Sequence, residues 1–233
     1  MTRIGLGQAP QEKDTKQQCV DPATLLAEGL VSVLRRAPAP GEISKFQRYL
    51  RLFLQWNSAH RLTAYRRPEE IVRKLFLDSL LFLKVLPPQA IKLLDFGSGA
   101  GIPGIPLKIV SPQIVLTLVE AQRRRSSFLA AVLRELELSD VRLVHGRAEQ
   151  VLTETPELVG AFDAVLLRAA GSLETIIPDA LSFLTREGFC IASGPPAGKT
   201  HRIAFEGAVA RWHSITSPFS RSPRQFLIVQ KMS

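Results

Sequence analysis

Cysteine is scarce in this sequence, with two residues, Cys19 and Cys190, in a chain of 233. Two distant cysteines cannot form a disulfide scaffold, and neither stands at the spacing of a metal-binding motif. No cluster of His, Cys and Asp suggests a set of metal ligands. We therefore expect no disulfide framework and no metal, and the few cysteines fit a reducing cytosol.

Long apolar runs are also absent. The most apolar stretch, 75–86, is interrupted by Asp78 and Lys84, whereas a membrane-spanning helix needs roughly 18 or more apolar residues in a row. Residues 1–18 are polar and of mixed charge, so no signal peptide is expected. The sequence predicts a cytoplasmic protein that does not enter a membrane.

Acidic residues are in the minority, because 21 Asp and Glu stand against 30 Lys and Arg, which leaves a net charge of +9. This balance favours a polyanionic partner, and nucleic acid comes first, although a solvated basic surface would give the same numbers. Hydrophobic residues make up 45% of the chain. That share is ordinary for a globular protein, so we expect a folded domain with a real core.

The first 90 residues carry only helical patterns. Residues 1–20 lack periodicity and are expected to form a flexible tail. Asp21 and the proline after it are typical of a helix start, and a Pro- and Gly-rich break at 38–41 separates this helix from a second amphipathic one. A third helix is expected to begin at Pro68. Residues 21–90 are therefore predicted to form a helical extension.

From Ile91 onward, strands alternate with helices. We expect strands at 93–96, 114–119, 141–144, 162–167 and 189–192, with helical patterns between them. This alternation predicts a parallel sheet with right-handed crossovers. Two further strands, 212–216 and 225–230, have no helix between them and are expected to form an antiparallel hairpin at one edge of the sheet. Residues 91–233 are thus predicted to be a Rossmann-like α/β domain.

The strongest local signal is the segment 95–104, where a buried strand runs directly into a series of glycines. Starting at Asp95 it has the form Asp-x-Gly-x-Gly-x-Gly, the usual signature of methyltransferases that use S-adenosylmethionine. Starting at Gly99 it has the form of a dinucleotide fingerprint, but the strand ends at Gly97, and prolines occupy the helix start that a pyrophosphate needs. S-adenosylmethionine is therefore favoured over a nucleotide, and the cofactor-binding candidates are Asp95, Gly97, Gly99 and Gly101.

Acidic residues follow the next two strands. Glu120 ends the second strand, where an acid typically accepts hydrogen bonds from two ribose hydroxyls; the alternative is a cap on the helix that begins near Gln122. Ala148 and Glu149 follow the third strand. A small residue and an acid at that place suit the edge of an adenine ring, and the alternative is a plain loop.

Several narrower segments occur together in this chain: Arg61-Leu62-Thr63-Ala64, Phe76-Leu77-Asp78-Ser79, the loop 97–107, Arg124-Arg125, Gly146-Arg147-Ala148-Glu149 and Arg168-Ala169. On these segments the chain, over roughly residues 55–184, resembles the glucose-inhibited division protein B family. Members of this family, also called RsmG, methylate N7 of a guanine in small-subunit (16S) ribosomal RNA. The resemblance implies a class I methyltransferase sheet with an N-terminal helical extension. It also implies S-adenosylmethionine as cofactor and S-adenosylhomocysteine as product, with cofactor contacts at Gly97, Ile102, Ala148, Glu149 and Arg168, and an acidic position at Glu120.

Methylation at N7 of guanine needs alignment and a suitable electrostatic environment and no general base, because N7 carries an in-plane lone pair. The end of the fourth strand, 166–169, lacks the Asn-Pro-Pro-Tyr sequence that serves exocyclic amines, and no Cys is present there for attack on a pyrimidine. Arg168 is the catalytic candidate. At that place in the fold it faces either the carboxylate of the cofactor or an RNA phosphate.

The implied partner is 16S ribosomal RNA or the small ribosomal subunit, bound by a monomer mainly through its phosphates. The basic candidates for this contact lie at both ends of the domain: Arg61, Arg66, Arg67, Arg123, Lys199 and Arg202. Tyr65, within the basic loop, is expected either to stack on a base or to be half-buried.

Three places depart from the family pattern. Leu75 stands where the family has His, Arg61 stands where it has Asn, and residues 192–196 replace a Leu-Lys-Gly segment, with Lys199 a few residues further on. These differences concern the RNA-facing side more than the cofactor pocket. They leave open a methyltransferase of another substrate and a module that binds S-adenosylmethionine or RNA without turnover, although the intact glycine loop argues against the latter.

Overall fold

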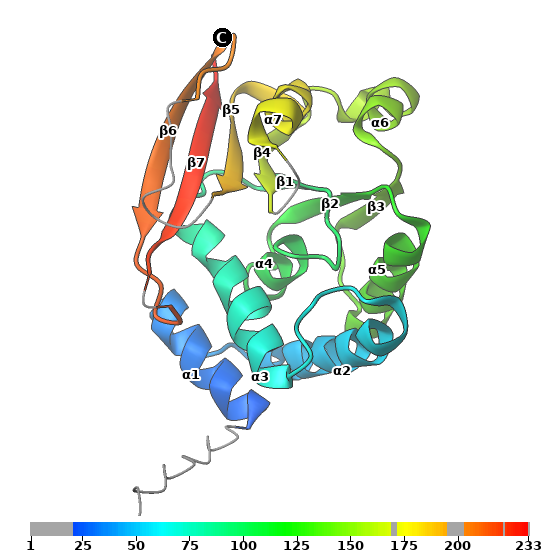
Figure 1. Cartoon of the computed structure of the whole chain (residues 1–233), viewed down its shortest axis with the longest axis vertical. Helices are drawn as coiled ribbons and strands as arrows, with labels where there is room; N and C mark the ends of the chain where they lie inside the picture. Colours follow the sequence, from blue (N-terminus) through cyan, green and yellow to red (C-terminus); the bar gives the residue numbers. More distant parts are fainter. Residues whose placement is uncertain (1–20, 169–171, 195–202, 221, 233) are drawn as a thin grey trace, which may run out of the picture.

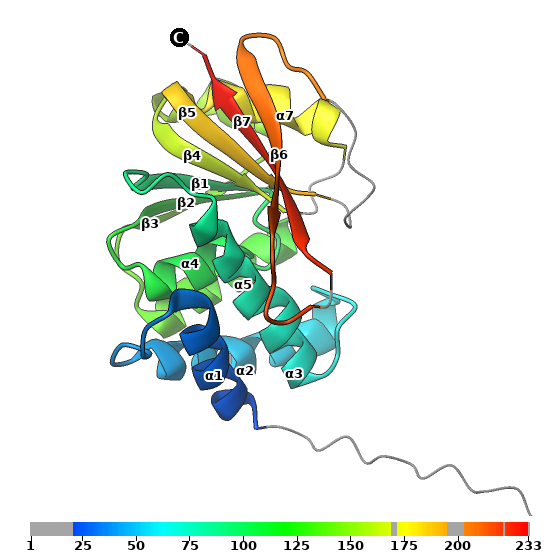
Figure 2. The same cartoon turned by 90° about the vertical axis from the view of Figure 1, so that its left-hand side faces the viewer.

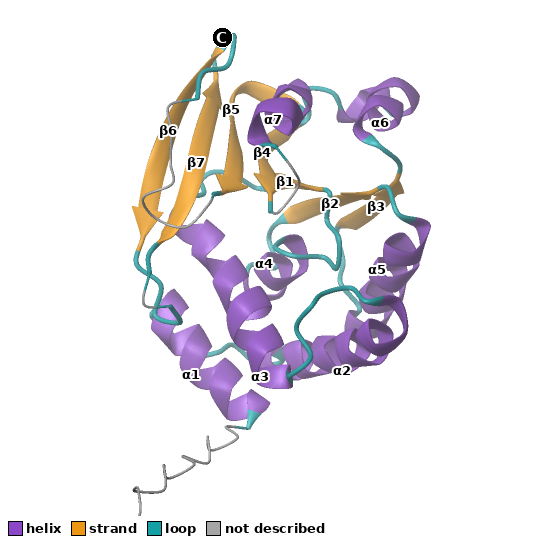
Figure 3. Ribbon diagram, viewed as in Figure 1, coloured by secondary structure: helices purple, strands orange, loops and turns teal. Residues whose placement is uncertain are grey.

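The computed structural model describes residues 21–168, 172–194, 203–220 and 222–232, and a seven-stranded sheet lies at its centre (Figures 1 and 3). Its strands are β1 (Lys92–Phe96), β2 (Val115–Glu120), β3 (Val141–His145), β4 (Phe162–Leu167), β5 (Leu184–Ser193), β6 (Ala208–Ile215) and β7 (Arg224–Lys231). They follow the order β3-β2-β1-β4-β5-β7-β6. The strands β1 to β5 are parallel to one another, whereas β7 is antiparallel to both β5 and β6. The predicted parallel sheet with an antiparallel edge hairpin is confirmed.

Helices cover both faces of this sheet (Figure 2). They are α1 (Pro22–Leu34), α2 (Glu42–His60), α3 (Pro68–Ile71), α4 (Gly104–Val110), α5 (Arg123–Leu136), α6 (Ala148–Glu154) and α7 (Leu173–Ser182). The helix α3 continues into the π-helical turn η1 (Val72–Leu77) and then, after two residues, into the 3-10 helix η2 (Leu80–Lys84); a short 3-10 turn, η3 (Pro156–Leu158), follows α6. In Figure 2, α7 lies on one side of the sheet and α1 to α5 lie on the other.

Successive residues of the central strands point to opposite faces, so the protein has two hydrophobic cores. Leu93 and Ala164 belong to the core that includes α1, α2, α4 and α5. Their neighbours Leu94 and Val165 belong to the core that includes α6 and α7. Continuous apolar strands are expected where helices cover both faces, and this explains why the strands could be predicted from short apolar runs.

The N-terminal extension shares its core with the sheet. Asp21 caps α1 by accepting a hydrogen bond from the Thr24 N–H (3.1 Å), as the sequence predicts. The rings of Tyr49 and Phe76 stack with their centroids 4.6 Å apart, and Phe128 of α5 packs beside them. Because these side chains form one cluster with the residues of the sheet, the extension is fixed against α4 and α5.

Two strand boundaries and one helix differ from the sequence prediction. The strand β5 begins at Leu184 instead of Phe189, and its pairing with β4 is irregular before Ala164. The strand β6 begins at Ala208, before the predicted residue 212. Residues 148–154 form the helix α6, although the sequence left a plain loop open there. The predicted flexible tail, 1–20, lies outside the described residues.

Candidate active site

The glycine loop follows β1 at the carboxyl edge of the sheet and leads into α4. Gly97 and Gly101 have φ angles of 74° and 80°, a region that residues with a Cβ atom rarely adopt. A Cβ atom on Gly101 would lie 2.4 Å from Ile105, so this glycine is needed for packing as well as for its backbone angle. The N–H of Gly97 donates to the carbonyl of Val119 (3.0 Å), which ties the loop to β2.

Asp95 lies underneath this loop and is 1% exposed. Its Oδ2 accepts a hydrogen bond from the N–H of Gly104 (2.7 Å), whereas its Oδ1 is buried without a hydrogen-bond partner among the described residues. Burial raises the pKa of Asp95 to about 7; the bond from Gly104 opposes this shift and the nearby Glu120 adds to it. Asp95 therefore holds the start of α4 in place and carries a group that is easily protonated.

Glu120 connects the loop to α5. Its Oε2 accepts from the N–H of Gly99 (2.8 Å) and its Oε1 accepts from the N–H of Gln122 (2.7 Å), the residue that precedes α5. The side chain is buried. A carboxylate offers about four acceptor sites, so two remain for the predicted ribose contact, which stays a prediction. The bond to Gln122 also agrees with the alternative interpretation of Glu120 as a cap.

A cavity of about 390 Å³ opens beside the loop, between β2, α6 and α7. Apolar side chains of Phe96, Val119 and Ile176 line it, together with Gly97. The predicted residues Ala148 and Glu149 also line it, and so does Asp179 of α7. Its volume lies within the range of roughly 300–1,000 Å³ that is usual for small-molecule sites.

Asp179 is a site residue that the sequence did not indicate. Burial raises the pKa of this carboxyl, and the negative charge of Glu149 raises it further. Two acids therefore face one mostly apolar cavity, where they can accept hydrogen bonds from an amine or from hydroxyls. Asp179 stands in the middle of an amphipathic helix, and only the spatial arrangement brings it to Glu149.

A second cavity, of about 210 Å³, lies on the other side of the loop, beneath the N-terminal extension. Gly97 lines both cavities, so they meet at that residue. The second cavity is lined by Gly99 and Ile102 from the loop, by Arg125 and Arg168, and by residues of the extension: Phe53, Leu62, Thr63 and Leu75. Of the predicted cofactor residues in the loop, Gly97, Gly99 and Ile102 therefore line a cavity. Asp95 and Gly101 line neither cavity and support the loop from within.

Tyr49 of α2 contacts the glycine loop at Ala100, a residue that lines the second cavity. Its hydroxyl donates a hydrogen bond to the carbonyl of Ala100 in the glycine loop. Burial raises the pKa of Tyr49 well above its usual value, and the charge of Asp95 adds to this shift, so the hydroxyl remains a donor. The extension therefore holds the loop directly.

Arg168 directly follows β4, and its guanidinium group faces the turn that contains residues 74–79. Nη2 donates to the carbonyl of Lys74 (2.6 Å) and lies 3.0 Å from Asp78 Oδ2. Nη1 donates to the hydroxyl of Ser79 (3.2 Å) and to the carbonyl of Leu75 (3.4 Å). These contacts occur beside the π-helical turn, a feature that is frequent at functional sites. The catalytic role of Arg168 stays a prediction.

Asp78 holds a second arginine as well. Its Oδ1 lies 3.1 Å from Nε of Arg224 at the start of β7, and Arg224 Nη2 donates to the hydroxyl of Ser193 at the end of β5 (2.8 Å). In the sequence, Asp78 stands out as a polar residue within the apolar stretch 75–86 and as one carrier of the family resemblance. The structure shows that it joins the extension to β4 and β7.

The basic loop 61–67 lies between α2 and α3. Arg61, Arg66 and Arg67 are exposed, and Arg67 forms an ion pair with Glu70 (3.3 Å). Tyr65 is half-buried against the core, with the Lys74 ammonium 5.6 Å from the centre of its ring. The structure therefore supports the half-buried alternative for Tyr65.

A buried asparagine fixes this loop. Asn57 donates to the carbonyl of Tyr65 (2.8 Å) and accepts from the N–H of Thr63 (2.9 Å). Arg123, another predicted RNA contact, is exposed at the start of α5. The remaining two candidates, Lys199 and Arg202, lie outside the described residues.

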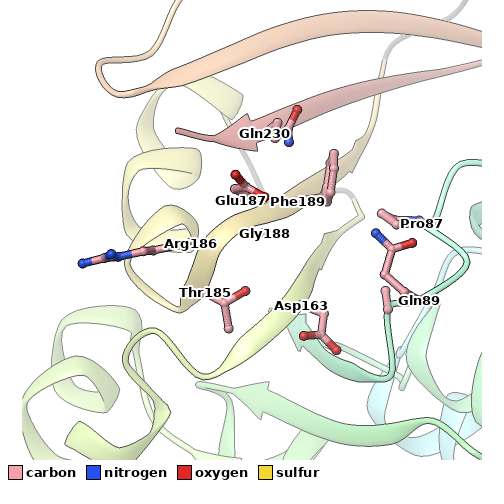
Figure 4. Close-up of a pocket in the computed structure, with 10 residues that line it drawn as sticks. Pro87, Gln89, Asp163, Thr185, Arg186, Glu187, Gly188, Phe189 and Gln230 are labelled. Carbon is pink, nitrogen blue, oxygen red and sulfur yellow. The ribbon is translucent and has the colours of Figure 1, made fainter. Parts of the chain in front are cut away.

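Another cavity, of about 240 Å³, lies at the opposite edge of the sheet (Figure 4). It is bordered by residues before β1 and at the start of β5, and by Asp163, whose Oδ2 accepts from the N–H groups of Ile91 and Lys92 (2.9 and 2.8 Å). Figure 4 shows Arg186 pointing away from the other side chains. Ligands of open parallel sheets bind beyond the carboxyl ends of the strands, so this cavity is a poor candidate for the active site.

The two cavities at Gly97 fit S-adenosylmethionine. The larger cavity is mostly apolar, with two acids that suit an adenosine, and the smaller cavity has two guanidinium groups that suit a carboxylate. Within the described part of the chain, no group of three or more His, Cys, Asp and Glu is placed to hold a metal ion. In the same part, no helix is long and apolar enough to span a membrane.

Comparison with known proteins agrees with this site. A family model described as rRNA small subunit methyltransferase G matches residues 42–194. Proteins named ribosomal RNA small subunit methyltransferase G are similar to this chain: that of Desulfitobacterium hafniense is 39% identical over 152 residues, and that of Desulforamulus reducens is 34% identical over 196 residues. The first match covers 65% of this chain and 62% of that protein; the second covers 80% and 81%.

A solved structure supports the fold. The O-methyltransferase from Bacillus cereus, in complex with SAH, has a TM-score of 0.56 and 16% sequence identity, and the match covers 88% of this chain and 96% of that one. At this identity the likeness concerns the class I methyltransferase fold alone.

Proposed function

We propose that this chain, which belongs to the rRNA small subunit methyltransferase G family, is a methyltransferase of small-subunit ribosomal RNA. It would transfer the methyl group from S-adenosylmethionine. The observation that carries the proposal is the pair of cavities that meet at Gly97, one mostly apolar with acids and one basic beneath the extension. Together they offer a place for a cofactor and an opening toward a target base.

The cofactor would be held by residues of both cavities. S-adenosylmethionine supplies an electrophilic methyl group when it is bound. Glu149 and Asp179 would accept hydrogen bonds from its adenosine part, with Phe96 and Ile176 against the ring, and Glu120 would accept from the ribose. The loop glycines allow the backbone to approach closely, because no side chain stands between them and the ligand.

The proposed target atom is N7 of a guanine. The described residues that line the smaller cavity include no carboxylate, imidazole or thiol, so this wall offers no general base. This composition suits an acceptor that already carries a lone pair, because such a base needs alignment and exclusion of water. In this account Phe53 and Leu75 exclude water, and Arg168 holds the π-helical turn beside the base.

RNA would approach over the basic loop 61–67 and the start of α5. Arg61, Arg66 and Arg123 are exposed there and would contact phosphates, so binding should weaken as salt is raised. We expect the enzyme to act as a cytoplasmic monomer. The replacement at Leu75 makes one wall of the cavity apolar, and we expect guanine to be tolerated there.

Methyl transfer tests the proposal. Purified protein is incubated with radiolabelled S-adenosylmethionine and small-subunit particles, or their naked RNA, from a strain that lacks the family's enzyme. We expect label in 7-methylguanosine after nucleoside analysis, and no label with particles from a strain that retains the enzyme. If S-adenosylhomocysteine binds in calorimetry but no label reaches either substrate, a different substrate or a binding module replaces the proposal.

A further inference from the structure

The smaller cavity contains two arginines, and the structure distinguishes between them. An inference about these two arginines rests on the proposed function, because it concerns the part of S-adenosylmethionine that carries an α-carboxylate. A carboxylate that leaves water needs a cation or several N–H donors. Arg125 and Arg168 are the cationic side chains among the described residues that line this cavity.

Arg168 already has partners within the protein. Its terminal nitrogens donate three hydrogen bonds to residues 74–79 and lie 3.0 Å from the carboxylate of Asp78. A ligand carboxylate that took these donors would leave the carbonyl of Lys74 without its donor, and Asp78 would keep only the ion pair with Arg224. Such an exchange gains little, because one charged hydrogen bond replaces another.

Arg125 is in the opposite situation. It is the third residue of α5 and is half-buried, and its side chain forms no hydrogen bond or ion pair with the described residues. Its Nη1 lies 3.9 Å from the position that a Cβ atom on Gly99 would occupy, so the guanidinium group is beside the glycine loop. The donors of Arg125 are therefore available at the loop.

The position of Arg125 also has an electrostatic cost that an anion would offset. Three arginines, 123–125, occupy the first turn of α5, and the structure places no acid in that turn. The N-terminus of a helix carries a partial positive charge, so cations there are unfavourable. Glu120 lies close by, but its two oxygens accept from the backbone of Gly99 and Gln122.

We infer that Arg125, and not Arg168, binds the α-carboxylate of the cofactor. The guanidinium group of Arg125 would pair with the two carboxylate oxygens at the edge of the loop. Arg168 would then hold the turn at 74–79 in place, and so keep the wall of the smaller cavity in position. This assignment differs from one of the two alternatives in the sequence prediction, in which Arg168 faces either the cofactor carboxylate or an RNA phosphate.

Calorimetry with two probes tests this assignment. S-adenosylhomocysteine carries the carboxylate, whereas 5′-methylthioadenosine has the same adenosine and sulfur without the amino-acid part. We expect Arg125→Gln to raise the Kd of S-adenosylhomocysteine about tenfold to a hundredfold, as for the loss of a charged hydrogen bond, and to leave the Kd of 5′-methylthioadenosine unchanged. Arg125→Lys should restore part of the affinity, because it keeps the charge.

Arg124→Gln is the matched control. Arg124 is the exposed neighbour of Arg125, lines neither cavity and carries the same charge, so this variant should bind both probes like the wild type. Arg168→Gln should weaken both probes to a similar degree, since it disturbs the wall and not the carboxylate.

Other results would overturn the inference. Equal weakening of both probes by Arg125→Gln would mean that Arg125 shapes the loop. Unchanged binding of S-adenosylhomocysteine, with a raised KM for RNA, would assign Arg125 to a phosphate of the substrate. If the wild type itself bound no S-adenosylhomocysteine, the proposed function would fail together with this inference, whereas normal wild-type binding with an unaffected variant would refute the inference alone.

Discussion

Asp95 should make the stability of the protein depend on pH in a direction unusual for a carboxyl. Its pKa rises from 3.8 to about 7 in the folded protein, mainly because the side chain is buried. Between these two values the unfolded chain has released the proton while the folded chain still holds it. Stability therefore falls as the pH rises through this window and levels off above the folded pKa.

The size of this effect follows from the shift. One pKa unit corresponds to about 1.4 kcal/mol, so the whole shift corresponds to about 4 kcal/mol, of which about 3 kcal/mol falls between pH 5 and pH 8. Asp95→Asn removes the titration and retains an oxygen that can accept from Gly104. The free energy of unfolding of the variant, minus that of the wild type, should therefore increase by about 3 kcal/mol from pH 5 to pH 8.

Urea denaturation of both proteins at several pH values measures this difference. Other titrating groups cancel in the comparison, and high salt should change the result little, because the carboxyl is buried. Parallel stability curves for the two proteins would show that Asp95 ionises normally under the loop, and would refute this account of its burial.

Two further predictions concern the residues that support the site. Tyr49→Phe removes the hydrogen bond to the Ala100 carbonyl. It should raise the Kd of S-adenosylhomocysteine about threefold to tenfold, because a net hydrogen bond contributes about 0.5–1.5 kcal/mol. An unchanged Kd in calorimetry would contradict the role of the extension in holding the loop. Asp78→Asn leaves two arginines without their carboxylate and should lower the free energy of unfolding by about 3 kcal/mol in urea titrations. Arg142→Gln, which breaks an exposed ion pair with Glu157, should leave that free energy nearly unchanged, and equal effects of the two variants would contradict the assignment.

Most of the fold could be predicted from the sequence because its signals are local. The strands at 93–96 and 162–167 are short apolar runs buried on both faces, and Asp21 with the proline after it marks the start of α1. The glycine loop was recognised because its residues are adjacent in the chain. The boundary of β5 was missed because residues 184–188 pair irregularly with β4.

The supports of the site could not be predicted, because they join residues that are far apart in the chain. Tyr49 is one aromatic residue on an amphipathic helix, and nothing in its local sequence indicates that its hydroxyl reaches the loop at Ala100. Asp179 meets Glu149 only after α6 and α7 pack on the same face of the sheet. The partners of Arg168 lie in a turn about ninety residues earlier in the chain.

The central claim is that the cofactor lies across Gly97, with its adenosine in the larger cavity and its amino-acid end beneath the extension. A crystal structure of the protein with S-adenosylhomocysteine tests this claim most directly. The account predicts an adenine beside Phe96 and Ile176, near Glu149 and Asp179, and a carboxylate at Arg125. A ligand in the cavity at the amino edge of the sheet, or an amino-acid end that points away from the extension, would contradict it.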